Sequence, residues 1–205
     1  MTTGPAQRTQ AERRESTRAA LVAAARPLFG QRGYAGVGTE EIVRAAGVTR
    51  GALYHHFEGK EGLFIAVFEA VEQELLDQIA ARVAADAVAS PLGALETGLA
   101  VMLDTAVDTE LAQIVLIDAP SVLGWERWRE IGWRYGMGLT ETVLEAAMAA
   151  GEIPRGPLKP LAHVLLGAID EAVLYIARAT DQRTARDEMA AVLGGLLAGL
   201  RTQPA

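Results

Sequence analysis

The chain has 205 residues, of which 50% are hydrophobic, a formal net charge of −7 and no cysteine. This length can bury a substantial core in one domain or two small ones, and the lack of cysteine excludes a disulfide-stabilised fold. The polar N-terminus has no apolar signal core, and no uninterrupted apolar run approaches the roughly 18 residues of a membrane span, so we expect a cytoplasmic protein without membrane contact.

Charge is distributed unevenly along the chain. Residues 1–64 hold nine basic and six acidic side chains, a balance of +3, which leaves −10 for the remainder. A basic N-terminal part on an acidic body is typical of a protein that contacts nucleic-acid phosphates at one end. The counts alone leave open a charge pattern that is merely solvated.

The N-terminal segment divides into an arm and a helix. Residues 1–14 are polar, contain Gly and Pro and lack apolar periodicity, which predicts a flexible arm. The region from Glu15 to Gln31 has apolar side chains at helical spacing and is followed by Gly33, which is a natural stop. The sequence therefore predicts a first helix over these residues.

Residues 38–57 contain two short helical patterns joined by a tight turn. Thr39 is the expected cap of the first helix and Thr49 the expected cap of the second, while Gly47 can adopt the left-handed backbone that ends a helix abruptly. This is the spacing of a helix-turn-helix, which lays its second helix in the major groove of DNA.

In the second of these helices, Leu53 and Phe57 face inward, so the other side chains form an outward surface of donors, aromatic rings and small groups. Lys60 opens the next helix, where the amine and the helix dipole favour a phosphate; a solvated lysine is the alternative. The residues expected to contact DNA are Thr39, Thr49, Arg50, Gly51, Ala52, Tyr54, His55, His56 and Lys60.

These residues resemble the N-terminal domain of the TetR family of bacterial transcriptional regulators. The similarity covers about the first 75 residues and rests on Leu21 through Phe29, Gly33, Tyr34, Thr39, Ile42, Ala46 to Val48, Gly51, Leu53, Tyr54, His56, Phe57, Lys60 and Leu63. It implies an all-α homodimer of about nine helices, with a helix-turn-helix domain over 15–62 and a ligand-binding and dimerisation domain over 63–205. In such a protein a small molecule releases DNA, and Lys60 contacts phosphate.

The pattern of the remaining chain predicts successive helices without strands. We expect helices over about 60–82, 92–107, 110–119, 125–150, 161–179 and 185–200. Pro120 is expected to halt the apolar 110–119 helix and to begin a loop. Gly151 closes the long helix before it, and a proline-rich loop follows.

All three tryptophans lie in the segment 124–138. Packing in the core or an interface is one explanation, and an apolar ligand chamber is the other. Asp118 or His163 would fix the ligand's orientation, although Asp118 is equally compatible with solvent, a nearby backbone group or Arg127. The expected ligand contacts are Leu99, Met102, Val115, Asp118, Trp128, Trp133, Met137 and His163.

An apolar stripe with interspersed glycines marks the last helix. Glycine inside a helix costs roughly 1 kcal/mol relative to alanine, which close packing against a second subunit would offset; ordinary packing within the chain is the alternative. The resemblance places dimerisation on the last two helices. The expected interface residues are Met189, Val192, Leu193, Gly195, Leu196, Gly199 and Leu200.

Enzyme chemistry has little support in the sequence. There is no cysteine nucleophile, no G-x-S-x-G elbow, no phosphate loop and no cluster of histidines with metal-ligand spacing, so we expect neither an enzyme, a cofactor nor a metal. We expect a repressor that a mainly apolar effector releases from a roughly palindromic operator. The alternatives are an activator, a co-repressor-dependent regulator, or a helical binding protein or enzyme without DNA function.

Overall fold

The computed structural model describes residues 9–202, and every regular element in this range is helical, as predicted. Nine continuous helical stretches follow one another, because α6, η1 and α7 run together without a break. The elements are α1 (Gln10–Arg32), α2 (Thr39–Ala45), α3 (Arg50–His56), α4 (Gly59–Ala85), α5 (Pro91–Thr105), α6 (Thr109–Leu111), the π-helix η1 (Ala112–Asp118), α7 (Ala119–Leu123), α8 (Trp125–Ala149), α9 (Leu158–Arg178) and α10 (Gln182–Gly199).

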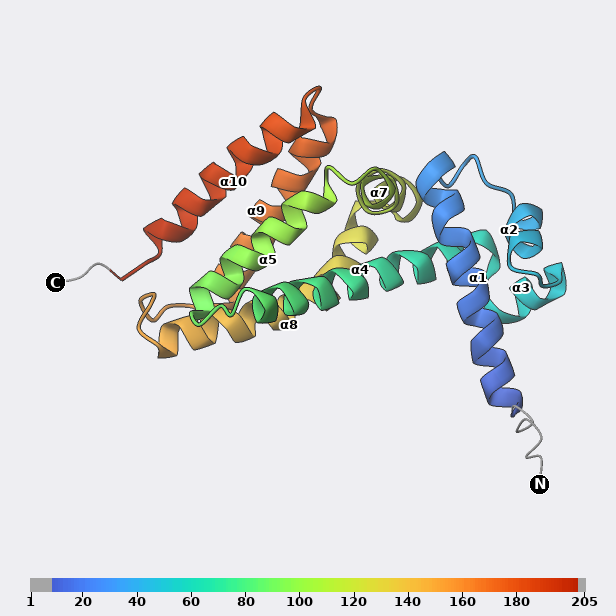
Figure 1. The fold of residues 1–205 in the computed structure, drawn as a ribbon, viewed down its shortest axis with the longest axis horizontal. Helices are drawn as coiled ribbons and strands as arrows, with labels where there is room; N and C mark the ends of the chain where they lie inside the picture. Colours follow the sequence, from blue (N-terminus) through green and yellow to red (C-terminus); the bar gives the residue numbers. More distant parts are fainter. Residues whose placement is uncertain (1–8, 203–205) are drawn as a thin grey trace.

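Helices α1 to α3 form a compact group, the head, at one end of the long helix α4 (Figure 1). Helix α4 runs from the head into the body, which comprises α5 to α10. The α6–η1–α7 stretch packs against α1 as well as against α4 and α8, so it lies between the head and the rest of the body. One long helix and one irregular helical stretch therefore connect the two parts.

The first helix begins earlier than predicted. Thr9 caps α1 by accepting a hydrogen bond from the N–H of Glu12, and the Glu12 carboxylate accepts one from the N–H of Thr9. This reciprocal capping box satisfies two backbone donors and stabilises a start at Gln10. The predicted flexible arm is therefore wrong for residues 10–14, while residues 1–8 lie outside the described part of the chain.

Pro120 does not end a helix, contrary to the prediction. The chain forms a π-helix just before it, in which the N–H of Ala119 bonds to the carbonyl of Ile114, five residues back. The wider turn shifts the hydrogen-bond register, so the missing N–H of Pro120 falls at the first turn of α7, where it costs little. The helical path continues to Leu123, and Gly124 ends it at a φ of 79°.

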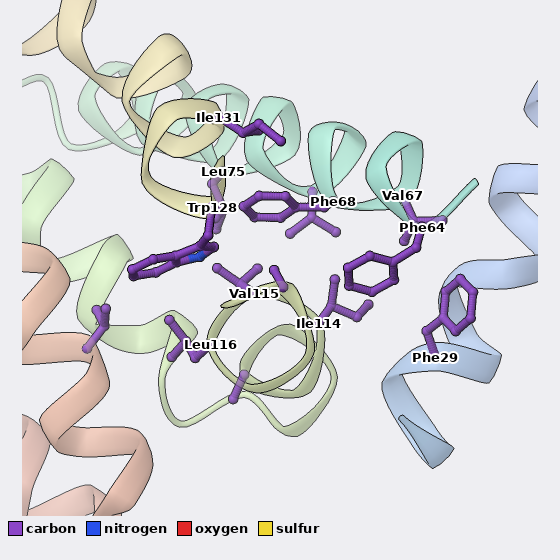
Figure 2. Close-up of a cluster of buried hydrophobic side chains, with 14 of the residues drawn as sticks. Phe29, Phe64, Val67, Phe68, Leu75, Ile114, Val115, Leu116, Trp128 and Ile131 are labelled. Carbon is purple, nitrogen blue, oxygen red and sulfur yellow. The ribbon is translucent and has the colours of Figure 1, made fainter. Parts of the chain in front are cut away.

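A single hydrophobic cluster extends from the head into the body (Figure 2). Phe29 of α1 meets Phe64 of α4 edge to face, at 5.3 Å between ring centroids. Farther along α4, Phe68 lies near Val115 of η1 and Trp128 of α8. Because all these side chains are nearly fully buried, a shift of η1 or α4 would be felt in the head.

Helix α9 is long and strongly apolar. Its length and composition would suffice to cross a membrane, with a mean hydropathy of 1.5, yet only 28% of that window is buried. In this fold α9 packs against α5, α8 and α10, with an exposed apolar side that includes Val164 and Tyr175.

Candidate functional site

The turn of the helix-turn-helix has the predicted backbone. Gly47 has a φ of 66°, a left-handed conformation that suits glycine, and the Thr49 hydroxyl accepts a hydrogen bond from the N–H of Ala52. Thr39, however, is the first residue of α2 and not its cap. Gly38 occupies the cap position without a side-chain hydrogen bond, so the capping role predicted for Thr39 is wrong.

Helix α3 exposes a polar and aromatic surface. Arg50 and Tyr54 lie one turn apart, with the guanidinium 5.6 Å from the centroid of the ring. Arg50 also lies 3.5 Å from Glu40 of α2 in an exposed ion pair, which is weak enough to exchange for a DNA phosphate or base. Gly51 is exposed beside Arg50 and adds no bulk to the surface.

The two histidines at the end of α3 differ in environment. His55 is exposed, whereas His56 is half-buried and turned toward α1, not fully outward as predicted. Loss of solvation, His55 and the guanidinium groups of Arg14 and Arg18 lower the pKa of His56, so it is neutral at pH 7. Arg14 and Arg18 thus bring the positive N-terminal half of α1 beside the predicted reading helix.

Lys60 is engaged inside the head. Its ammonium donates to the carbonyls of Tyr34 and Val37 at 2.9 and 3.0 Å, and it lies 3.9 Å from the centroid of the Tyr34 ring. Two of its three donors therefore hold the loop between α1 and α2. This role was not anticipated, and the phosphate contact stays a prediction.

The body contains a mainly apolar cavity of about 240 Å³ bordered by α4, α5, η1, α8 and α9. This volume lies just below the roughly 300–1,000 Å³ of typical ligand pockets, so it suits only a small organic molecule. Five of the eight predicted ligand contacts line it, namely Leu99, Met102, Val115, Trp128 and Trp133.

A small group of polar side chains breaks the apolar wall. The Asp170 carboxylate accepts a hydrogen bond from the Trp133 ring N–H at 3.0 Å and lies 3.7 Å from Nε of Arg129. Burial raises the pKa of Asp170, opposed by Trp133 and Arg129. Arg129 also lies 4.2 Å from the Trp133 ring, and Glu72 of α4 borders the same cavity.

Glu72 and Arg129 were missed by the sequence reasoning. The signal for Glu72 was present, because it stands four residues after Phe68 and three before Leu75 on the apolar stripe of α4. A carboxylate in that register is expected to face the interior, where burial without a partner is costly.

Three of the predicted ligand contacts do not line this cavity. Met137 packs against a second apolar cluster around Leu92 and Leu144, since its direction on α8 differs from that of the cavity-lining Gly136. His163 is exposed and contacts the Trp133 ring edge-on from outside, at 4.3 Å between ring centroids.

Asp118 is the third, and it faces the head. Its carboxylate accepts a hydrogen bond from the backbone N–H of Tyr34 at 2.6 Å and another from the Gln113 amide at 3.1 Å. Burial raises the pKa of Asp118, while these two bonds and Lys60 oppose the shift. The bond to a backbone group, which the sequence left open, is the one observed, so Asp118 connects η1 with the start of the loop in the head.

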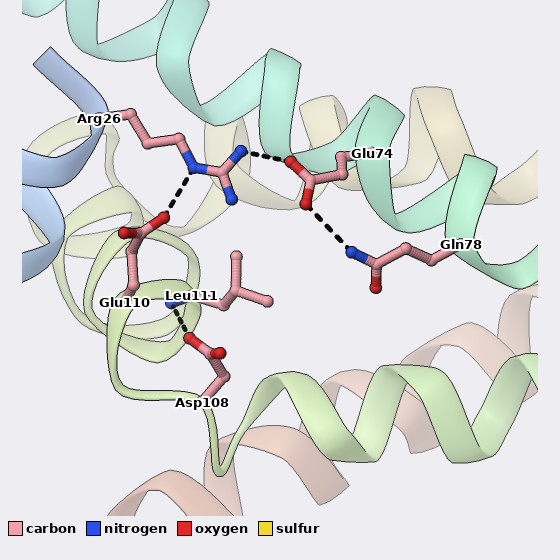
Figure 3. Close-up of polar contacts among 6 residues, drawn as sticks. All are labelled: Arg26, Glu74, Gln78, Asp108, Glu110 and Leu111. Atoms are coloured by element: carbon pink, nitrogen blue, oxygen red, sulfur yellow. Dashed lines mark hydrogen bonds and ion pairs between the residues drawn. The ribbon is translucent and has the colours of Figure 1, made fainter. Parts of the chain in front are cut away.

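A second connection joins α1 to the body (Figure 3). Arg26 donates to Glu110 of α6 at 2.7 Å and also pairs with Glu74 of α4. The helices approach so closely that a Cβ atom at Gly30 would lie 2.4 Å from Cγ of Glu110. The head is thus bonded to α4, which borders the cavity, and to α6, which leads directly into the cavity-lining η1.

The predicted dimer residues divide between two faces of α10. Leu193 is buried within its own chain, with 7% exposed, and Met189 and Leu200 pack partly against the core, so Leu193 does not fit the prediction. The exposed residues form one stripe at helical spacing, namely Val192, Gly195, Leu196 and Gly199. Val164 and Tyr175 of α9, which were not predicted individually, are exposed as well.

Comparison with known proteins agrees with this architecture. Residues 21–67 match the model of bacterial regulatory proteins of the tetR family, and residues 92–200 match that of the tetracyclin repressor-like C-terminal domain. A TetR-family transcriptional regulator from Pectobacterium atrosepticum is 32% identical, with a TM-score of 0.83 over 97% of this chain and 100% of that one.

Two curated relatives extend the comparison. The transposon Tn10 TetC protein of Escherichia coli is 26% identical over 94% of this chain and 96% of its own. The HTH-type transcriptional regulator CymR of Pseudomonas putida is 42% identical over 80 residues, 39% of each chain. With both of its domains matched, the chain belongs to the TetR family of bacterial transcriptional regulators.

Proposed function

We propose that this regulator is a homodimeric repressor that leaves its operator when a small molecule occupies the body cavity. The observation that carries the proposal is the position of η1. Val115 and Leu116 of η1 line the cavity, and Asp118, two residues later, bonds to the backbone of the head. A ligand that displaces η1 therefore acts directly on the loop that supports the reading helix.

The head supplies the DNA contacts in this proposal. Arg50, Tyr54 and His55 enter the major groove, and the small Gly51 permits close approach. Because the Lys60 ammonium is bonded to two loop carbonyls, its main effect is to orient the head, with a phosphate contact through its third donor.

The second subunit covers the exposed faces of α9 and α10. Val192 and Leu196 are each 58% exposed and Val164 is 66% exposed, an apolar surface that favours association. A Cβ atom at Gly195 or Gly199 would meet no atom within 4 Å inside the described chain, so these glycines serve no internal packing. Helices from two subunits can approach closely there, and the twofold axis presents two heads to a palindromic site.

Release follows from a change in the distance between the two heads. A ligand that fits best with η1 or α4 displaced biases the dimer away from the spacing of about 34–36 Å between successive major grooves. A coupling free energy of only about 1–3 kcal/mol lowers operator affinity roughly 5–150-fold.

Selection of DNA fragments from the source genome, followed by fluorescence anisotropy, tests the proposal. We expect a selected fragment with twofold symmetry and an affinity that falls when a compound found by thermal-shift screening is added. Linkage requires that saturating operator weaken binding of that compound by the same factor. A DNA affinity indifferent to every cavity ligand would contradict release, and failure to enrich any fragment would contradict operator binding.

A further inference from the structure

The cavity wall contains one carboxylate without a partner. Glu72 is only 8% exposed and borders the cavity from α4, between the apolar side chains Phe68 and Leu75. Within residues 9–202 it forms no ion pair, and no hydrogen bond contributes to its environment. A buried carboxylate in this situation is costly unless something else occupies the space beside it.

The charged groups that face Glu72 leave it without a counterion. Asp170 of α9 is a second carboxylate and disfavours ionisation of Glu72. Arg129 of α8 is the cation of the cavity wall; it forms an ion pair with Asp170 at 3.7 Å and stacks on Trp133, while its buried Nε makes no hydrogen bond within the described residues. Tyr135 of α8 is the remaining titratable neighbour. The cavity-lining side chains from α5 and η1 are uncharged, so the described wall contains two carboxylates and one guanidinium.

There is room for a ligand group next to this carboxylate. Gly132 of α8 lies opposite, and a Cβ atom there would be 3.8 Å from Oε1 of Glu72. Trp128 and Trp133 border the same space, and electron-rich ring faces attract cations as well as apolar groups. The wall thus combines an unpaired carboxylate, aromatic faces and an otherwise apolar lining.

We infer that the cavity takes a lipophilic cation, an amine or quaternary ammonium on an apolar body, whose positive charge pairs with Glu72. An anion is disfavoured, because it would meet two carboxylates, and the charge of the one guanidinium is already offset by its ion pair with Asp170. The inference rests on the proposed function in one respect, namely that this cavity is the effector site.

Proton linkage gives the inference a distinctive signature. Burial and Asp170 raise the pKa of Glu72 to about 7, so in the empty cavity Glu72 is protonated below that pH. A permanent cation binds the ionised form, and its affinity therefore rises as Glu72 loses its proton. Between about pH 6 and about pH 8 the ionised fraction increases about tenfold, and the affinity should follow it.

Calorimetry with benzyltrimethylammonium and its neutral isostere neopentylbenzene tests the inference on the full-length dimer. The quaternary probe does not titrate, so a change of its affinity with pH reports on the protein. We expect it to bind about tenfold more tightly at the higher pH, with no such change for the isostere. Glu72→Gln should abolish this pH dependence and weaken the cation at least tenfold at the higher pH while the isostere binds as before.

Glu69→Gln provides the matched control. Glu69 lies one turn earlier on α4, pairs with Arg134 outside the cavity and undergoes the same change of charge and shape. Its variant should bind the cation like the parent. Retained binding of neopentylbenzene and a cooperative thermal transition would show that Glu72→Gln still folds.

Three results would each overturn the inference. They are equal binding of the cation and its isostere, no cation binding at millimolar concentration, and an unchanged pH dependence of cation binding in Glu72→Gln. Operator affinity distinguishes it from the proposed function. Tight, Glu72-dependent cation binding that leaves DNA affinity unchanged supports the ligand class and removes the release mechanism. Release of DNA by the neutral isostere but not by the cation supports the release mechanism and removes the proposed ligand class.

Discussion

Replacing Asp118 with alanine interrupts a direct hydrogen-bonded connection between η1, which lines the cavity, and the head. In the native chain the Asp118 carboxylate accepts hydrogen bonds from the backbone of Tyr34 and from Gln113, while Val115, on the same π-helix, lines the cavity. The variant leaves the cavity-lining side chains intact and removes the bond that reaches the head, together with the bond to Gln113 within η1. We expect it to weaken the effect of a ligand on DNA more than it weakens either ligand or DNA binding alone.

The stability cost follows from two opposing contributions. A hydrogen bond to a charged group contributes about 1.5–3 kcal/mol, and the 2.6 Å bond to Tyr34 belongs to this class. The buried carboxylate also carries a desolvation cost, which raises its pKa and which alanine removes. We therefore expect the free energy of unfolding to fall by about 1–2 kcal/mol.

The informative measurement is the ratio of operator affinities without and with a saturating cavity ligand, obtained by fluorescence anisotropy. In Asp118→Ala this ratio should fall at least about fivefold, which corresponds to about 1 kcal/mol of lost coupling. Asp118→Asn keeps an acceptor for the Tyr34 N–H and should therefore retain part of this affinity ratio.

Asp108→Ala is the matched control (Figure 3). Asp108 caps α6 by accepting from the N–H of Leu111 at 2.8 Å, so its loss costs about 0.5–2 kcal/mol of stability without breaking a bond to the head. Its coupling ratio should match the parent. If Asp118→Ala retained the full ratio, or if both variants lost it equally, η1 would not be the connection.

Further variants address the interface, the reading helix, the loop and the cavity. Gly195→Leu should convert the dimer to monomer with little loss of protomer stability, because a Cβ atom at this position meets no other atom of the described chain within 4 Å. Light scattering checks this, with Gly138→Leu, at an exposed helical glycine on α8, as the control that should stay dimeric. Arg50→Ala should cost on the order of 1–3 kcal/mol of operator binding and relax preference at one base position, measured with single-base operator variants. Lys60→Ala should lower stability by about 1–2 kcal/mol, because two loop carbonyls lose a charged donor, and weaken all operators alike, as urea titration and anisotropy would show. The pKa of Glu72 is raised from 4.5 to about 7 in the folded state, so the folded state is favoured by protonated Glu72 below about pH 4.5 and loses this advantage as pH rises through about 7. The free energy of unfolding of the parent, measured in urea, should therefore fall by about 3 kcal/mol more over this window than that of Glu72→Gln.

The reading device could be recognised from the chain because its determinants are local. The left-handed Gly47, the capping Thr49 and the inward Leu53 act within a few residues of one another, and each has the predicted conformation or burial. The same holds for the long helices, whose apolar periodicity extends over several turns. Even the early start of α1 was readable, since Thr9 and Glu12 form the capping-box spacing that the prediction overlooked.

Pro120 and Asp118 show where local rules failed. A proline in an apolar helix predicts a stop, but the π-helical hydrogen bonds before Pro120 place it in the first turn of α7, where its missing N–H is tolerated. That π-helical register depends on how η1 packs between α1, α4 and α9. The direction of Asp118 depends on the same packing, because its partner Tyr34 is 84 residues away in the sequence.

The cavity and the dimer face depend on long-range packing in the same way. Trp128 and Trp133 were identified as pocket residues by type, yet Met137 and His163, equally suitable by type, point elsewhere. A helix presents its side chains about every 100°, so neighbours of the same chemistry separate once partner helices set its rotation. Composition thus predicted an aromatic, mainly apolar chamber, whereas the packing of five elements placed Glu72 in its wall and turned Asp118 away from it.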